Sequence, residues 1–253
     1  MSFDSRDVTT NHEHDSICMC PSGGQCSIDA DESVRLKKIS LKLIYQEVLC
    51  HLPFTVLSII LSIVILSFMY FNEMLSSAQE NVVYAYHVLF HVFHYIHILF
   101  AVIGTYLMFT RFSGRKIWAI VISLLVPAVF CTFSDAILPA VAGTLLGVEM
   151  DMHICFFYPD DLFNMIIFLL VGLLCAYALK KKQSTQASLL SFGMHFCHIF
   201  ASSLAALFYM VSYGFDGWVD SLGMLFVYLI FCVMIPCVMS DLVVPLYLAR
   251  KLE

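Results

Sequence analysis

Residues 83–109 read VYAYHVLFHVFHYIHILFAVIGTYLMF, a run of 27 residues that contains no Lys, Arg, Asp or Glu. A helix of this length rises about 40 Å at ~1.5 Å per residue, which exceeds the ~30 Å hydrocarbon core of a bilayer. Four histidines nevertheless interrupt the apolar run. Ionisable side chains inside a membrane helix are costly, so their presence here indicates a site within the membrane.

The last two histidines of this run belong to a pattern that occurs twice. His94 and His97 return 101 residues later as His195 and His198, and isoleucine follows each pair. Two other patterns recur in the same order, with offsets of 102 and 106 residues: Glu47/His51 with Glu149/His153, and Ser134/Asp135/Pro139 with Ser240/Asp241/Pro245. An ordered second copy of three polar patterns predicts an internal repeat.

The composition predicts an all-α integral membrane protein in contact with a lipid bilayer, and no nucleic-acid partner. Hydrophobic residues make up 60% of the chain, the mean hydropathy is +0.87, and only 13% of residues are charged. A soluble domain carries roughly 25% charged residues. We predict six transmembrane helices, at about residues 52–71, 83–109, 117–147, 162–179, 190–213 and 221–249.

The distribution of charge predicts an orientation for these helices. All 13 Lys and Arg residues precede the first helix, follow the sixth, or lie in the loops after the second and fourth helices. The opposite loops hold eight Asp and Glu residues and no Lys or Arg. The positive-inside rule therefore predicts that both termini are cytoplasmic. The first forty residues are polar and have no apolar core region, so we expect no signal peptide. We expect the protein to lie in a plasma or inner membrane.

An odd number of helices in each copy predicts that the two copies have inverted topology. Residues 35–147 would form one three-helix repeat and residues 148–253 the other, related by a pseudo-two-fold axis in the membrane plane. Secondary transporters share this architecture, with the substrate site near the midplane. The sequence gives no indication of the oligomeric state.

The repeated patterns supply candidate metal ligands. Imidazole and carboxylate ligands suit Fe²⁺, Zn²⁺, Mn²⁺, Co²⁺ and Ni²⁺, with Fe or Zn favoured, and suit Mg²⁺ or Ca²⁺ less well. The central candidates are His94, His97, Asp135, His195, His198 and Asp241. The candidates for secondary metal sites or gates are Glu47, His51, Glu149, His153, His91 and His87. Four cysteines lie near these candidates: Cys131, Cys197, Cys232 and Cys237. Their thiolates would extend the metal list toward Zn²⁺ or Cu⁺, but the favoured interpretation is that they are buried small apolar side chains.

Prolines flank both acids of the predicted central site. Pro127 and Pro139 stand on either side of Asp135, and the second copy has the same arrangement, with Pro236 before its acid and Pro245 after it. Proline removes a backbone donor and frees a carbonyl one turn earlier. We therefore expect the third helix of each repeat to be interrupted at its acid.

Residues 1–34 differ from the rest of the chain because they are polar and contain few apolar residues. This composition predicts a disordered cytoplasmic tail. Five possible soft-metal ligands lie within it: His12, His14, Cys18, Cys20 and Cys26. They predict a loose metal-chelating segment.

The sequence favours a transporter over an enzyme. The leading hypothesis is a secondary transporter of a divalent transition-metal cation, with a His/Asp site at the midplane and proton exchange as a natural coupling. One alternative is a membrane metalloenzyme of the zinc hydrolase or di-iron oxidase type. Another is a b-type cytochrome, in which histidines of the second and fifth helices would bind haem.

Overall fold

The computed structural model describes residues 41–75, 82–182, 187–215 and 217–252. Within these ranges the protein is helical and has no strands, and six helices are long and apolar enough to cross a membrane. The prediction of an all-α protein with six spans is therefore confirmed. The tail of residues 1–34, with its five predicted chelating side chains, lies outside the described residues.

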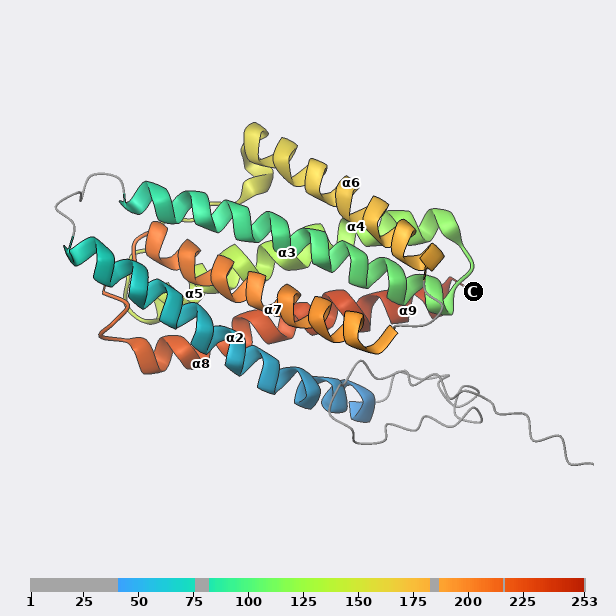
Figure 1. Cartoon of the computed structure of the whole chain (residues 1–253), viewed down its shortest axis with the longest axis horizontal. Coiled ribbons are helices and arrows are strands. Elements are labelled where there is room, and N and C mark those ends of the chain that lie inside the picture. Colours follow the sequence, from blue (N-terminus) through green and yellow to red (C-terminus); the bar gives the residue numbers. More distant parts are fainter. Residues whose placement is uncertain (1–40, 76–81, 183–186, 216, 253) are drawn as a thin grey trace, which may run out of the picture.

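Four of the spans are single α-helices and two are composite (Figure 1). In each composite span a five-residue π-helix joins two α-helices without a break in the chain. The spans are α2 (Leu41–Leu75), α3 (Val82–Phe112), α4 (Lys116–Thr132) with η2 (Phe133–Ile137) and α5 (Leu138–Leu145), α6 (Pro159–Lys182), α7 (Ala187–Ser212), and α8 (Leu222–Val238) with η4 (Met239–Val243) and α9 (Val244–Lys251).

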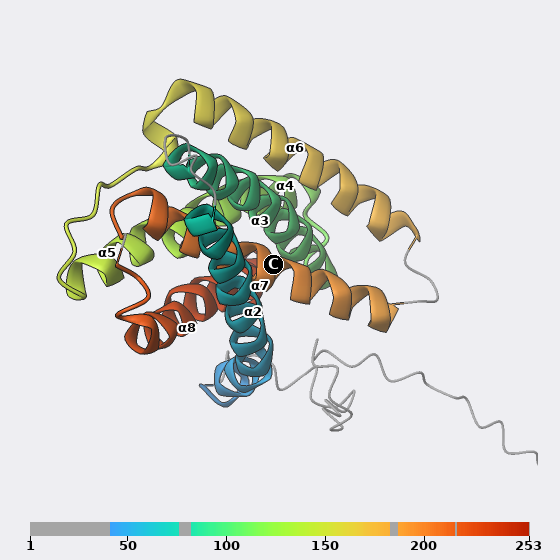
Figure 2. The ribbon, with the colours of Figure 1, turned by 60° about the vertical axis from the view of Figure 1, so that its left-hand side comes forward.

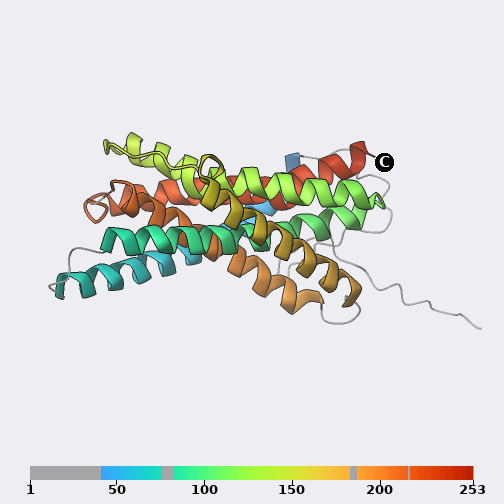
Figure 3. The same cartoon turned by 90° about the horizontal axis from the view of Figure 1, so that it is seen from above.

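α7 and α3 form the centre of the bundle, and α2 and α6 lie on its outside (Figures 2 and 3). Other helices bury 72% of the most apolar stretch of α7 and 56% of that of α3, but only 28% of that of α2 and 22% of that of α6. Large apolar side chains on the outer helices are exposed, for example Phe68, Phe163 and Leu174. An apolar outer surface of this extent is what contact with lipid requires, and it indicates a multi-pass membrane protein.

α6 approaches α3 closely at a glycine. A Cβ atom added to Gly172 would lie 3.0 Å from the carbonyl oxygen of Leu99 and 3.0 Å from the side chain of Val102. Small residues allow membrane helices to pack backbone against backbone. In the first turn of α6, Asp161 Oδ1 accepts a 3.2 Å hydrogen bond from the hydroxyl of Tyr95, which lies among the histidines of α3.

The segment between α5 and α6 is not helical over residues 148–154 and then forms the short 3-10 helix η3 (Cys155–Phe157). It is held against the end of α7, where Asp151 N donates a 3.0 Å hydrogen bond to Tyr213 O. Gly214 follows with φ of +122°, and a Cβ there would lie 2.7 Å from Glu149 O. Only glycine suits both this backbone conformation and this close approach.

Candidate metal centres

The centre of the bundle contains a buried group of metal-ligand side chains from three spans. His97 of α3 and His198 of α7 face each other, with 3.2 Å between their Nε2 atoms. Cys237 of α8 approaches the same point, its Sγ 3.7 Å from His97 Nε2. The three ligand atoms lie within 4.8 Å of one another, and all three residues are buried. This is the geometry of side chains that can share one cation.

Two more side chains complete what we call the central cluster, namely His97, His198, Cys237, Asp241 and Cys131. Asp241 Oδ2 lies 3.4 Å from His198 Nε2, and Cys131 Sγ lies 3.7 Å from His97 Nε2. The sequence interpretation favours buried apolar side chains for both cysteines and keeps thiolate ligands as the alternative. They stand three residues before each repeated serine, with the same offset of 106 residues as the two acids. That spacing was the signal that could have identified them.

Both acids lie in π-helical turns of the same kind. In η2 the backbone N–H of Leu138 donates to the carbonyl oxygen of Phe133, five residues earlier, and in η4 Val244 donates to Met239 in the same way. A proline follows one residue after each of these donors. Proline cannot donate to the residue four positions earlier, and a wider turn accommodates this loss. The expected interruption is therefore a π-helix, in which the chain stays helical through both acids.

Asp135 is fully buried and saturated with partners. Its Oδ2 accepts hydrogen bonds from Nδ1 of His97 at 2.7 Å and from Nδ1 of His94 at 2.8 Å. Its Oδ1 accepts from the hydroxyls of Ser134 at 2.7 Å and Ser202 at 2.8 Å. A proton fixed on Nδ1 leaves Nε2 of His97 free to bind a cation, as carboxylate partners do for metal-bound histidines. Asp135 therefore lies behind the central cluster and orients one of its ligands.

Asp241 stands in the matching place but has far fewer contacts. Besides the 3.4 Å approach of His198, its carboxylate faces Gly104 of α3, where an added Cβ would lie 3.6 Å away. No donor in the described part of the chain lies within hydrogen-bonding distance of Asp241 Oδ1, which is buried. The neighbouring Ser240 carbonyl accepts a 3.1 Å hydrogen bond from the hydroxyl of Thr105. This carboxylate thus keeps capacity for a cation.

The other predicted central residues lie to either side of this cluster. His94 is buried and stacks on Phe90, with ring centroids 5.5 Å apart. His195 is half-buried and meets His51 of α2 edge to face, with 4.2 Å between ring centroids. Glu47 lies within α2, and Glu149 is exposed in the non-helical segment before His153. The structure thus brings His195 together with His51 rather than with the two acids.

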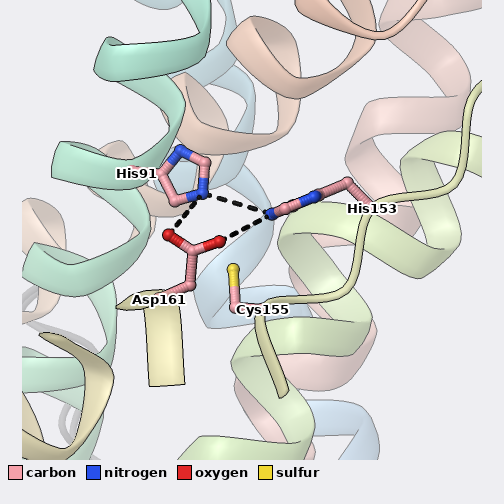
Figure 4. Close-up of side chains that lie close together, drawn as sticks. All are labelled: His91, His153, Cys155 and Asp161. Carbon is pink, nitrogen blue, oxygen red and sulfur yellow. Dashed lines mark hydrogen bonds and ion pairs between the residues drawn. The ribbon is translucent and has the colours of Figure 1, made fainter. Parts of the chain in front are cut away.

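A second group lies toward the end of the bundle where α5 connects to α6, and we call it the loop-end cluster: His91, His153, Cys155 and Asp161 (Figure 4). The Nε2 atoms of His91 and His153 are 3.3 Å apart. Asp161 faces both, with Oδ1 3.3 Å from His91 Nε2 and Oδ2 3.0 Å from His153 Nε2. The four ligand atoms all lie within 4.8 Å of one another. His87 lies beside this cluster, its ring centroid 4.4 Å from that of His91.

The sequence interpretation found only the histidines of the loop-end cluster. Cys155 follows His153 by two residues, and Asp161 occupies the first turn of α6. Burial, and then the nearby charge of His91, lowers the pKa of His153, while burial raises the pKa of the Cys155 thiol. A neutral imidazole is ready to bind a metal, whereas the thiol must first lose its proton.

The imidazole rings form three successive pairs along the bundle. The two α3 histidines of these pairs, His91 and His97, stand six residues apart, which is about 9 Å along the helix axis at ~1.5 Å per residue. From the end near the start of α2 to the loop end, the pairs are His51 with His195 at 4.2 Å between centroids, His198 with His97 at 4.5 Å, and His91 with His153 at 5.3 Å. Side chains that could bind a metal are therefore distributed along the length of the bundle as well as at its centre.

Comparisons of this chain with protein-family models, with curated proteins and with solved structures find no match.

Proposed function

We propose that this protein is a secondary transporter of a divalent transition-metal cation. The observation that carries the proposal is the approach of His97 Nε2 and His198 Nε2 to 3.2 Å, deep between membrane-length helices and beside Asp241 and Cys237. Nitrogen, sulfur and carboxylate ligands favour Zn²⁺, Fe²⁺ and Co²⁺ over Mg²⁺ and Ca²⁺. The central cluster would be the binding site for the transported cation.

The His51–His195 pair supports transport over simple storage of an ion. A metal that leaves the central cluster finds ligands in His195 and His51 toward the end of the bundle near the start of α2. We further propose that the two halves are inverted repeats that expose the central cluster to each side in turn. Protons displaced when metal binds to imidazole and thiol groups would supply the coupling.

Two features argue against haem bound between the paired histidines. Axial imidazoles lie on opposite faces of a porphyrin, and 3.2 Å between the Nε2 atoms leaves no thickness for the macrocycle between them. The Sγ atoms of Cys131 and Cys237 also lie 3.7 Å from His97 Nε2, in the space that the macrocycle would need.

Metal flux into proteoliposomes tests the proposal. Purified protein would be reconstituted with a fluorescent metal indicator inside the vesicles, and Zn²⁺, Fe²⁺, Co²⁺ and Mg²⁺ would be supplied outside. We expect saturable uptake of transition metals, little Mg²⁺ uptake, and loss of uptake in His97→Ala and Cys237→Ser. Cys197→Ser is the matched control, because Cys197 adjoins His198 on α7 but is exposed. Equal uptake in all these proteins would contradict the proposal.

A further inference from the structure

We propose that the loop-end cluster is a second metal site, a closed four-ligand site that holds a resident Zn²⁺ ion. The ion would fix the 148–158 segment and the start of α6 to α3. This inference goes beyond the proposed function, because it assigns the cluster a bound ion that stays in place while cargo passes through the central cluster. It holds whether or not the protein transports metal.

The spacing of the ligand atoms fits a tetrahedral ion. Zinc binds imidazole nitrogen and carboxylate oxygen at about 2.0–2.2 Å, so the edges of the coordination tetrahedron are about 3.3–3.6 Å. The Nε2 atoms of His91 and His153 are 3.3 Å apart, and each lies 3.0–3.3 Å from a different oxygen of Asp161. Cys155 supplies the fourth corner (Figure 4). Small movements would bring all four atoms to bonding distance from one centre.

The hydrogen bonding of His91 calls for a positive charge at that centre. Its Nδ1 lies 2.9 Å from the carbonyl oxygen of His87, and a carbonyl only accepts, so Nδ1 carries a proton. When His91 is neutral, its Nε2 lone pair faces Asp161 Oδ1 at 3.3 Å, which is repulsive. A proton on Nε2 removes this repulsion by forming an ion pair, and a bound cation removes it by forming a coordinate bond to each atom.

Neighbouring side chains hold the other ligands in place. The ring of His153 is stacked between those of Tyr158, 4.3 Å away, and Tyr213, 5.2 Å away. Its backbone N–H donates a 3.0 Å hydrogen bond to the hydroxyl oxygen of Tyr209. Asp161 Oδ1 accepts a 3.2 Å hydrogen bond from the Tyr95 hydroxyl. Such outer contacts orient metal ligands and raise affinity.

The number and kind of ligands distinguish this site from one that releases its ion. Four protein ligands complete the tetrahedral shell of zinc and leave no open position, as in structural zinc sites. A thiolate among them disfavours Mg²⁺ and Ca²⁺. Three of the four residues are buried, and Asp161 alone is partly exposed, with 20% of its side chain accessible. The ion would therefore be retained, because only its carboxylate ligand is accessible from outside the site.

The test is the Zn²⁺ content of the full-length protein after exhaustive dialysis, measured by elemental analysis. Cys155→Ser and Asp161→Asn each preserve side-chain size and remove a strong ligand. Cys175→Ser and Asp160→Asn are the matched controls, since both residues are exposed on α6 and Asp160 adjoins Asp161. We expect each ligand variant to retain one Zn²⁺ per chain fewer than its control. If Cys155→Ser does not fold, Asp161→Asn at the rim decides the question alone.

A spectroscopic measurement identifies the ligand. Co²⁺ substituted for Zn²⁺ should give a thiolate-to-metal charge-transfer band whose intensity falls in Cys155→Ser and is retained in Cys175→Ser. Equal Zn²⁺ content in ligand variants and controls, or a cobalt spectrum that Cys155→Ser leaves unchanged, would overturn the second site. Failure of the central site would look different: flux would be absent while the loop-end variants still lost one Zn²⁺.

Discussion

The two π-helical turns η2 and η4 carry the same Ser-Asp pair, yet they leave their acids in different states. Asp135 in η2 has four hydrogen-bond partners at 2.7–2.8 Å and is fully buried. Asp241 in η4 is approached by one imidazole at 3.4 Å, and its other oxygen has no donor among the described residues. One carboxylate is satisfied by the protein and the other is available to a ligand.

The difference suggests that a duplicated motif has been divided between two tasks. A saturated carboxylate fixes the side chains around it, so Asp135 acts on the central cluster through the ring of His97. An unsatisfied carboxylate in a low-dielectric interior is costly unless a cation or proton joins it. Asp241 is therefore the acid that we expect to touch the metal, and Asp135 the acid that positions a ligand.

Replacing Asp241 with asparagine should have the largest effect on transport. The change removes the negative charge from the central cluster, and we expect metal uptake to fall by ~100-fold or more, beyond the range typical of changes to outer-shell residues. It also removes an unsatisfied buried charge, so the unfolding temperature should stay constant or rise. Uptake by proteoliposomes and thermal unfolding in detergent measure the two effects. Normal uptake, or a lower unfolding temperature, would break the distinction between the two acids.

Replacing Asp135 with asparagine should affect both stability and transport. The amide nitrogen cannot accept a hydrogen bond, so at least one of the four donors around the side chain loses its partner. We expect a cost of about 1–3 kcal/mol in the free energy of unfolding for each buried donor left unpaired. Metal affinity should fall about 10–100-fold as the ring of His97 loses its fixed orientation. The same two measurements apply, and an unfolding temperature equal to that of the wild type would show that Asp135 is not the structural acid.

The two acids themselves could be predicted from the sequence, because the repeated Ser-Asp-x-x-x-Pro pattern places each of them one turn before a proline. The six spans could be predicted for a similar reason, since length and apolar composition are local properties. The inverted relation of the two halves and the orientation in the membrane stay predictions. Length and apolar composition thus identified the helices, and the repeated motifs identified the polar residues within them.

The difference between the acids could not be predicted, because it depends on contacts between helices far apart in the sequence. Ser202 donates to Asp135, but the residue 101 positions earlier is Ala101, which has no hydroxyl to offer Asp241. Thr105 bonds the carbonyl of η4, and its counterpart is Ala206. Cys155 and Asp161 could not be predicted either. They have no copy in the other half, and only the folded chain brings them to His91.

The Ser202 hydroxyl offers a smaller test of the contrast. Ser202→Ala removes the 2.8 Å hydrogen bond to Asp135 Oδ1 while leaving both histidines in place. We expect about 1.5–3 kcal/mol lower stability, the usual contribution of a hydrogen bond to a charged group, and at most a modest loss of uptake. Ser203→Ala is the matched control, since that hydroxyl bonds the Ile199 carbonyl within its own helix. Equal unfolding temperatures for the two variants would mean that Asp135 does not depend on this donor.

The smallest expected effect concerns the backbone of η4. In a π-helical register the Ser240 carbonyl would pair with the N–H of residue 245, which proline lacks. The Thr105 hydroxyl occupies this place at 3.1 Å. Thr105→Val keeps the shape of the side chain and removes the donor. The expected loss is about 0.6 kcal/mol, the average for hydrogen bonds between membrane helices.

Thr132→Val next to η2 is the control for this change, because its hydroxyl bonds the Ala128 carbonyl in its own helix. Thermal unfolding compares their stability, and the metal concentration for half-maximal uptake shows whether η4 has moved Asp241. A shift of that concentration in Thr105→Val alone would mean that the π-turn positions the metal-binding acid. If neither variant alters it, Asp241 is held by the packing of α8 and α9 and the turn only accommodates the proline.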